Sequence, residues 1–192
     1  ASVWQNLAWL HFEVRNYALS AGFFQQRLQF PFVKPEHELN LLWAYARALF
    51  YNQEFQSAET TAEKAVQLAG KIPTMQTLAF QEKLAFYSAQ AGHHEKAACL
   101  YADILTKQGI PADNQAKAKL AYAYSLIKLN QKDQAREQLQ ALLNLCDSLP
   151  DQAVSDTRLL AFKPQRLKLI AFGLLSKISD DAEQRISFRQ QR

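Results

Sequence analysis

The sequence predicts an all-α fold, a right-handed α-α superhelix of about four antiparallel helix pairs with further helices capping its C-terminal end. Three observations support this prediction: the composition, a turn motif that recurs at a near-constant interval, and alanines that recur in step with it. Good helix formers such as Ala, Leu, Gln and Lys dominate the 192 residues. Gly occurs only 5 times and Pro 6 times, too rarely for the many turns of a β-rich fold.

The recurring motif is a short polar turn that opens a helix. The residues at its equivalent positions are Tyr17, Phe55, His94 and Lys132. The three intervals between them are 38, 39 and 38 residues. A near-constant period of this length indicates stacked helix pairs, each of which cannot bury its apolar face alone.

Small residues recur at the positions where two helices would have to approach closely. Nine residues before the four motif positions stand Ala8, Ala46, Ala85 and Ala123. The second helix of each pair repeats a core position at Phe24, Ala62, Tyr101 and Leu139, and another one turn later at Ala65, Ile104 and Leu142. Arg27 is the exception at this later position. Spacings of three and four residues place these side chains on one helical face.

This periodicity predicts eight helices and divides the chain at the end of the repeats. The predicted helices span 2–14, 17–30, 37–51, 55–70, 75–90, 94–107, 113–129 and 132–147. Residues 1–148 are expected to hold the four pairs, and residues 149–192 capping helices and a basic tail. After Pro150 the phase is lost, and we expect a short helix at 151–162, a longer one from Pro164 to Ile178, and a polar helix from Asp180.

The pattern resembles the tetratricopeptide repeat (TPR) family. The first pair bears the closest resemblance, through Trp4, Leu7, Ala8, Tyr17, Ser20 and Phe24. The later pairs match through Leu42, Tyr45, Ala46, Phe55, Ala58, Ala65, Leu84, Ala85, Gly92, Ala97, Tyr101, Tyr122, Ala123, Ala135 and Leu139. The period of 38–39 residues exceeds the family's usual 34, and the proline that ends a family unit is displaced or absent, which indicates a divergent member.

The resemblance implies that the first helix of each pair lines a concave groove for a partner. The groove positions it implies are Asn6, Trp9, Asn40, Trp43, Arg47, Phe50, Tyr51, Lys83, Phe86, Tyr124 and Lys128. Aromatic residues and Arg dominate binding hot spots, so we expect an apolar helix or an extended peptide with acidic flanks. A second interpretation is that the aromatic side chains belong to the core, and for Trp9, Trp43, Arg47 and Tyr124 both interpretations remain open.

The sequence contains none of the motifs that would indicate an enzyme. A phosphate-binding Gly-rich loop, a His-Glu-x-x-His motif and a Cys-x-x-Cys motif are all missing from it, so we predict no enzymatic activity, metal or cofactor. His93, His94 and Glu95 form the nearest approach to a metal cluster, but adjacent side chains on a turn point apart. We expect an exposed turn instead.

Charge and cysteine content give weaker indications. The net charge is +4. The segment from Arg158 onward carries a net charge of +5, and the rest of the chain −1. A solvated last helix explains this excess better than binding to nucleic acid or a membrane surface. Cys99 and Cys146 are predicted to be buried free thiols, which favours a reducing compartment such as the cytoplasm.

The function expected from these observations is that of a scaffold or adaptor for protein–protein interaction, alone or as part of a larger protein or complex. An alternative is a regulatory module that senses a peptide or small ligand. A third, less favoured alternative is nucleic-acid binding through the basic C-terminal segment.

Overall fold

Helices make up all the regular structure in the part of the chain that the computed structural model describes, residues 2–73, 77–148 and 164–178. They are α1 (Ser2–Glu13), α2 (Tyr17–Leu28), α3 (Pro35–Tyr51), α4 (Phe55–Ala69), α5 (Leu78–Gln90), α6 (His94–Thr106), α7 (Ala112–Lys128), α8 (Lys132–Ser148) and α9 (Pro164–Ile178). The prediction of an all-α fold built from helix pairs is confirmed. The predicted helices at 151–162 and from Asp180 lie outside the described residues, as does most of the basic segment from Arg158.

The predicted helix bounds hold to within a few residues. α9 has the predicted bounds, and the second helices of the pairs begin at the four predicted motif positions. α3 begins at Pro35, two residues earlier than predicted. Proline fits the first turn of a helix because the N–H that it lacks would have no partner there. The carboxylates of Glu36 and Glu38 in the same turn are stabilised by the positive end of the helix dipole.

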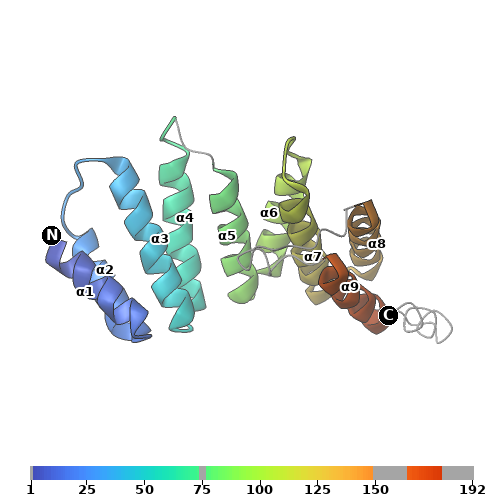
Figure 1. Ribbon diagram of the computed structural model, residues 1–192, viewed down its shortest axis with the longest axis horizontal. Helices are drawn as coiled ribbons and strands as arrows, with labels where there is room; N and C mark the ends of the chain where they lie inside the picture. Colours follow the sequence, from blue (N-terminus) through green and yellow to red (C-terminus); the bar gives the residue numbers. More distant parts are fainter. Residues whose placement is uncertain (1, 74–76, 149–163, 179–192) are drawn as a thin grey trace. The chain divides into compact units, whose positions relative to one another are not determined.

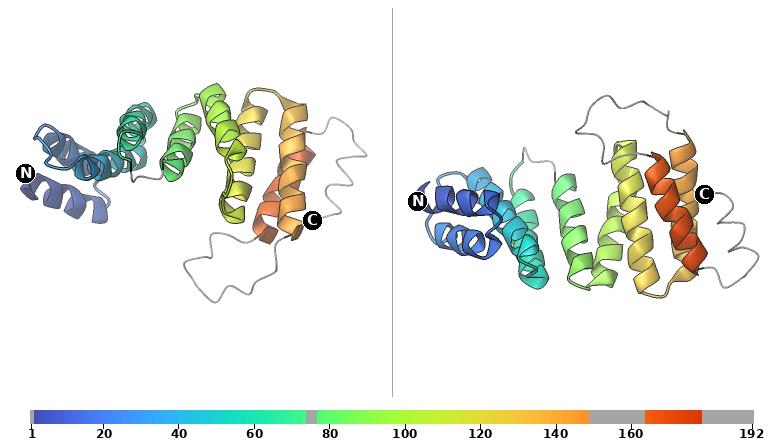
Figure 2. Two further views of the ribbon diagram at one scale, coloured as in Figure 1. Left: turned by 90° about the horizontal axis from the view of Figure 1, so that it is seen from above. Right: turned by 60° about the horizontal axis from the view of Figure 1, so that its bottom comes forward.

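The chain divides into two compact units, Ala1–Lys96 and Ala97–Arg192. Within the first unit, α1 packs on α2, α2 on α3, α3 on α4 and α4 on α5, so the helices follow one another in chain order (Figure 1). Within the second unit, α9 packs against both α7 and α8 (Figure 2). An ion pair between Lys168 and Asp147 joins α9 to α8. The division of the chain at residues 148 and 149 stays a prediction.

The same turn closes the first helix of all four pairs. Its central residue adopts a left-handed backbone, with φ between 59° and 86°, at Arg15, Gln53, Gly92 and Asn130. The N–H of the following residue donates to the carbonyl five residues earlier at 2.8–2.9 Å, and the N–H of the left-handed residue donates to the carbonyl three residues earlier at 3.0–3.2 Å. This double hydrogen bond is the Schellman motif, which satisfies carbonyls at a helix end. Its recurrence explains why each repeat alanine stands nine residues before the first residue of the second helix.

The repeated small and apolar residues are buried in the interior. Ala8, Ala46, Ala85 and Ala123 are fully buried, as the pattern predicted. The core positions on the second helices are also buried, at Phe24, Ala62, Tyr101 and Leu139. Removing these surfaces from water is the main favourable contribution to folding.

The turn at His93, His94 and Glu95 lies at the surface as predicted, since His93 and Glu95 are exposed. His93 also contacts α4, where its Nδ1 lies 2.6 Å from Oε2 of Glu59, an almost fully buried carboxylate. The ammonium of Lys96 binds the other oxygen of Glu59 at 2.7 Å and also pairs with Glu63. Cys146 is buried as predicted, but Cys99 is exposed because it lies on the face of α6 opposite Ala97 and Tyr101.

None of the described helices is both long and apolar enough to cross a lipid bilayer.

Candidate functional site

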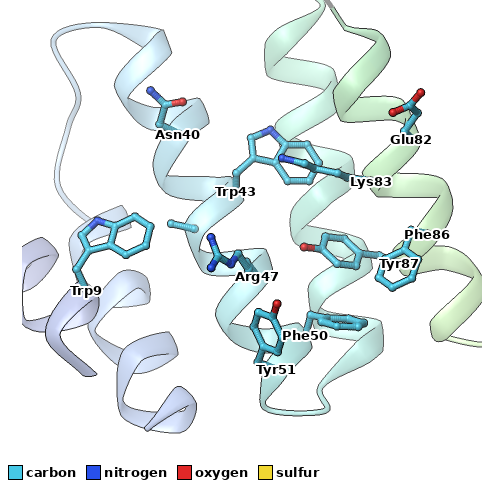
Figure 3. Close-up of a pocket in the computed structure, with 11 residues that line it drawn as sticks. Trp9, Asn40, Trp43, Arg47, Phe50, Tyr51, Glu82, Lys83, Phe86 and Tyr87 are labelled. Carbon is cyan, nitrogen blue, oxygen red and sulfur yellow. The ribbon is translucent and has the colours of Figure 1, made fainter. Parts of the chain in front are cut away.

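The first unit contains an open pocket of about 580 Å³ between α1, α3 and α5 (Figure 3). We call it the aromatic groove. It is lined by Trp9, Asn40, Trp43, Ala44, Arg47, Phe50, Tyr51, Glu82, Lys83, Phe86 and Tyr87. All three helices are the first members of their pairs.

Helical spacing explains how α3 supplies most of the lining. Asn40, Trp43, Arg47 and Phe50 follow one another at intervals of three or four residues and therefore share one face of the helix. The buried positions Leu39, Leu42, Ala46 and Leu49 fill a different face, which packs into the core. The amphipathic pattern of α3 thus separates the groove from the interior.

Trp43 belongs to both the groove and the core. Its indole stacks on Phe80 with centroids 5.2 Å apart and an interplanar angle of 15°, and only 8% of the residue is exposed. Its Nε1 is buried and donates no hydrogen bond within the described structure. The choice between groove and core that the sequence left open is therefore not exclusive at this residue.

The lower part of the groove is a cluster of aromatic rings from α3 and α5. The Phe50 centroid lies 5.2 Å from that of Phe86 and 5.3 Å from that of Tyr87. Phe86 and Tyr51 are exposed, with large apolar surfaces still accessible to solvent. Trp9 forms the opposite side from α1 and packs edge-on against Phe24 at 5.3 Å. Exposed aromatic rings held in fixed positions are well suited to bind an apolar side chain.

Two cations of the lining lie over aromatic rings. The Arg47 guanidinium carbon is 4.5 Å from the Phe12 centroid and 5.9 Å from the Tyr51 centroid. The Lys83 ammonium is 5.4 Å from the Trp43 centroid. Glu82 is the one acidic residue in the lining, so the groove has an excess of positive charge. A guest with acidic groups beside its apolar side chains would complement both features.

The hydroxyl of Tyr87 points into the groove toward Arg47 (Figure 3). Burial raises the pKa of Tyr87 to about 12, and Tyr51 adds to this increase while the nearby charge of Arg47 opposes it. The phenol therefore stays neutral at physiological pH and can both donate and accept a hydrogen bond.

The structure brings together eight of the eleven predicted groove residues, and Ala44, Glu82 and Tyr87 complete the lining. Asn6 is exposed on α1 but is not part of the lining. Tyr124 and Lys128 belong to the second unit, where the Lys128 ammonium lies 5.4 Å from the Tyr124 centroid. Tyr87 was missed, although it is four residues after Lys83 and could have been found by that spacing.

Comparison with known proteins supports the fold and not a specific family assignment. No protein-family model matches the sequence, and no curated protein matches it at a significant level. Among solved structures, a protein from Podosopora anserina described as a kinesin light chain with nearly identical TPR-like repeats is similar, with a TM-score of 0.72 and 17% identity over 98% of this chain and 89% of that chain. BtubC from P. vanneervenii has a TM-score of 0.73 and 14% identity over 96% and 75% of the two chains.

A third similar structure is YrrB, described as a TPR protein with an unusual peptide-binding site. Its TM-score is 0.56 and its identity 13%, over 97% of this chain and 90% of that chain. The resemblance to the TPR fold inferred from the sequence is confirmed at the level of structure.

Proposed function

We propose that this chain is a protein-interaction module whose first unit binds a segment of a partner protein in the aromatic groove. The segment would be an amphipathic helix or an extended peptide, and the chain would act as a scaffold or adaptor, alone or within a larger complex. The observation that supports this proposal most strongly is the lining itself, in which exposed aromatic rings and two cations face an open pocket of about 580 Å³.

The physical case rests on the types and exposure of the lining residues. Rigid aromatic side chains offer large contact areas and lose little conformational entropy on binding. A monomeric protein rarely leaves such a patch open to solvent unless something binds there. YrrB, which shares the fold, is described as having a peptide-binding site, and this is consistent with a peptide-sized guest.

The chain offers a matched pair of substitutions for a test. Phe86 in the groove and Tyr124 in the second unit each follow a repeat alanine directly, and each is 42% exposed. A library of random 12-residue peptides displayed on phage would be selected against the intact chain. The dissociation constant of an enriched synthetic peptide would then be measured by calorimetry for the wild type, Phe86→Ala and Tyr124→Ala.

We expect Phe86→Ala to weaken peptide binding at least about tenfold, as for a hot-spot residue, and Tyr124→Ala to leave it unchanged. Both variants should retain the helical circular-dichroism spectrum because both side chains are exposed. Unchanged binding in Phe86→Ala, or an equal loss in Tyr124→Ala, would show that the aromatic groove is not the binding site.

A further inference from the structure

Arg27 breaks the repeat pattern at a buried position. The equivalent residues of the other three pairs, Ala65, Ile104 and Leu142, are apolar and fully buried. Arg27 is only 9% exposed although it bears a positive charge. A charged group in such a place is costly unless it is paired, so a residue that violates the local pattern here calls for a functional explanation.

The protein itself supplies little for the Arg27 guanidinium to bind. Its Nη1 donates a hydrogen bond to the carbonyl of Phe30 at 3.2 Å, and its carbon lies 3.9 Å from the centroid of the Phe32 ring. Among the described residues, no carboxylate lies within ion-pair distance of Arg27. A guanidinium has five N–H donors in a planar fork, so much of its capacity remains for a partner outside the chain.

Arg27 lines a second pocket, which we call the arginine pocket. Its volume is about 280 Å³, and its lining consists of Gln5, Trp9, Arg27, Phe32, His37, Asn40, Leu41 and Ala44. Trp9, Asn40 and Ala44 also line the aromatic groove, so the two pockets adjoin within the first unit. The arginine pocket contains amide and imidazole groups that can donate hydrogen bonds, and none of its lining residues is acidic.

We infer that the arginine pocket is a carboxylate subsite, which takes an Asp or Glu side chain of the guest segment whose apolar side chains occupy the aromatic groove. This inference rests on the proposed function. The planar fork of Arg27 matches a carboxylate in bidentate geometry. The Phe32 ring and the Phe30 carbonyl hold the guanidinium in place before binding. Arg47 and Lys83 in the adjoining groove add positive charge, which favours an acidic guest over a basic one.

The test uses the peptide selection described above. Enriched peptides should contain Asp or Glu at a fixed spacing from an aromatic or large aliphatic residue. Replacing that acid by its amide should weaken binding to the wild type at least about tenfold, the typical strength of a charge-assisted pair. The same change should have almost no effect on binding to Arg27→Gln, because the variant has lost the group that recognises the charge.

Three controls make the result specific. Arg15→Gln removes an equal charge from an exposed turn of the first unit and should leave the tenfold discrimination intact. Arg27→Lys keeps the charge but not the fork and should retain only part of it. N-acetylglutamate N-methylamide, a free carboxylate without the peptide, should compete only at concentrations far above those of the peptide.

Several outcomes would overturn the inference. They are a lack of acidic residues among enriched peptides, equal sensitivity of the wild type and Arg27→Gln to the amide peptide, or competition by the free carboxylate as strong as that of the peptide. If enriched peptides still depend on Phe86, only the carboxylate subsite is wrong. If no peptide is enriched, or binding ignores Phe86, the proposed function fails together with it.

Discussion

At the residue scale, the four repeat alanines are small and fully buried, so the core around each of them has no room for a larger side chain. Ala85 on α5 has no exposed surface, whereas Ala79 on the same helix is exposed. We expect Ala85→Leu to lower the free energy of unfolding by about 1–3 kcal/mol, because three additional carbons must fit into a packed core. Ala79→Leu should change it by less than about 0.5 kcal/mol. Urea denaturation of both variants checks this, and similar effects at the two positions would contradict the assigned role of the repeat alanines.

The buried carboxylate of Glu59 makes the stability of the first unit depend on pH. Burial raises the pKa of Glu59, but the hydrogen bonds from Lys96 and His93 and the charge of Lys96 outweigh it, so the net pKa is lowered from its usual value of 4.5. The unfolded chain therefore binds the proton more readily than the folded chain. The stabilisation is present above the unfolded-state pKa and is lost as the pH falls through the folded-state pKa.

We expect Glu59→Gln to lower the free energy of unfolding at pH 7 by about 1–3 kcal/mol, because hydrogen bonds to a charged group are replaced by neutral ones. At pH 3, below the unfolded-state value of 4.5, the difference from the wild type should shrink, since the unfolded chain then binds a proton more readily than the folded chain. Glu63→Gln is the control: this residue also pairs with Lys96, but its side chain is far more exposed, so its effect should be smaller. A Glu59→Gln deficit that does not change with pH would contradict the linkage.

The sequence identified most groove residues but not their surroundings. Trp43, Arg47 and Phe86 were implied by the resemblance to the TPR family, and placing them needs the pattern of one helix only. The stacking of Trp43 on Phe80 involves two helices, and the pattern of α3 alone does not contain it. For the same reason, Arg27 was recognised as an exception to the repeat while its pocket was not foreseen.

At the element scale, glycines in two local environments give opposite expectations for one substitution. Gly22 lies inside α2, and a Cβ added there meets nothing within 4 Å. Gly92 is equally open but has φ of 86°, which side chains of L-residues rarely adopt. We expect Gly22→Ala to raise the free energy of unfolding by about 0.5–1 kcal/mol through helix propensity. Gly92→Ala should lower it by about 1–2 kcal/mol through backbone strain.

Urea denaturation compares the two variants under identical conditions, and a stabilising Gly92→Ala would show that the turn is not left-handed in solution. The sequence predicted where these turns lie because polar residues recur there. It did not predict their geometry, since three of the four left-handed positions hold Arg15, Gln53 and Asn130 instead of glycine.

At the scale of the whole molecule, the proposed binding site belongs to one of the two units. A peptide that occupies the aromatic groove should therefore slow hydrogen exchange in α1, α3 and α5 while leaving exchange in α7, α8 and α9 unchanged. At a free concentration of 100 times the Kd, binding stabilises the folded state by about 2.7 kcal/mol. Exchange measured by mass spectrometry on the intact chain checks this, and equal protection of α7 would mean that the guest also contacts the second unit.

The sequence by itself determined the fold class, the phase of the four turns and the repeated core positions of the helix pairs. These properties follow from the spacing of residues along one helix or across one turn, and such spacing is visible without coordinates. Only the tertiary structure decided that Trp43 is partly covered by α5 and that Arg27 lines a pocket beside the groove. It also decided that Glu59 is paired with His93 and Lys96. Each of these depends on residues from different elements, whose distances are set by the packing of the helices and not by their periodicity.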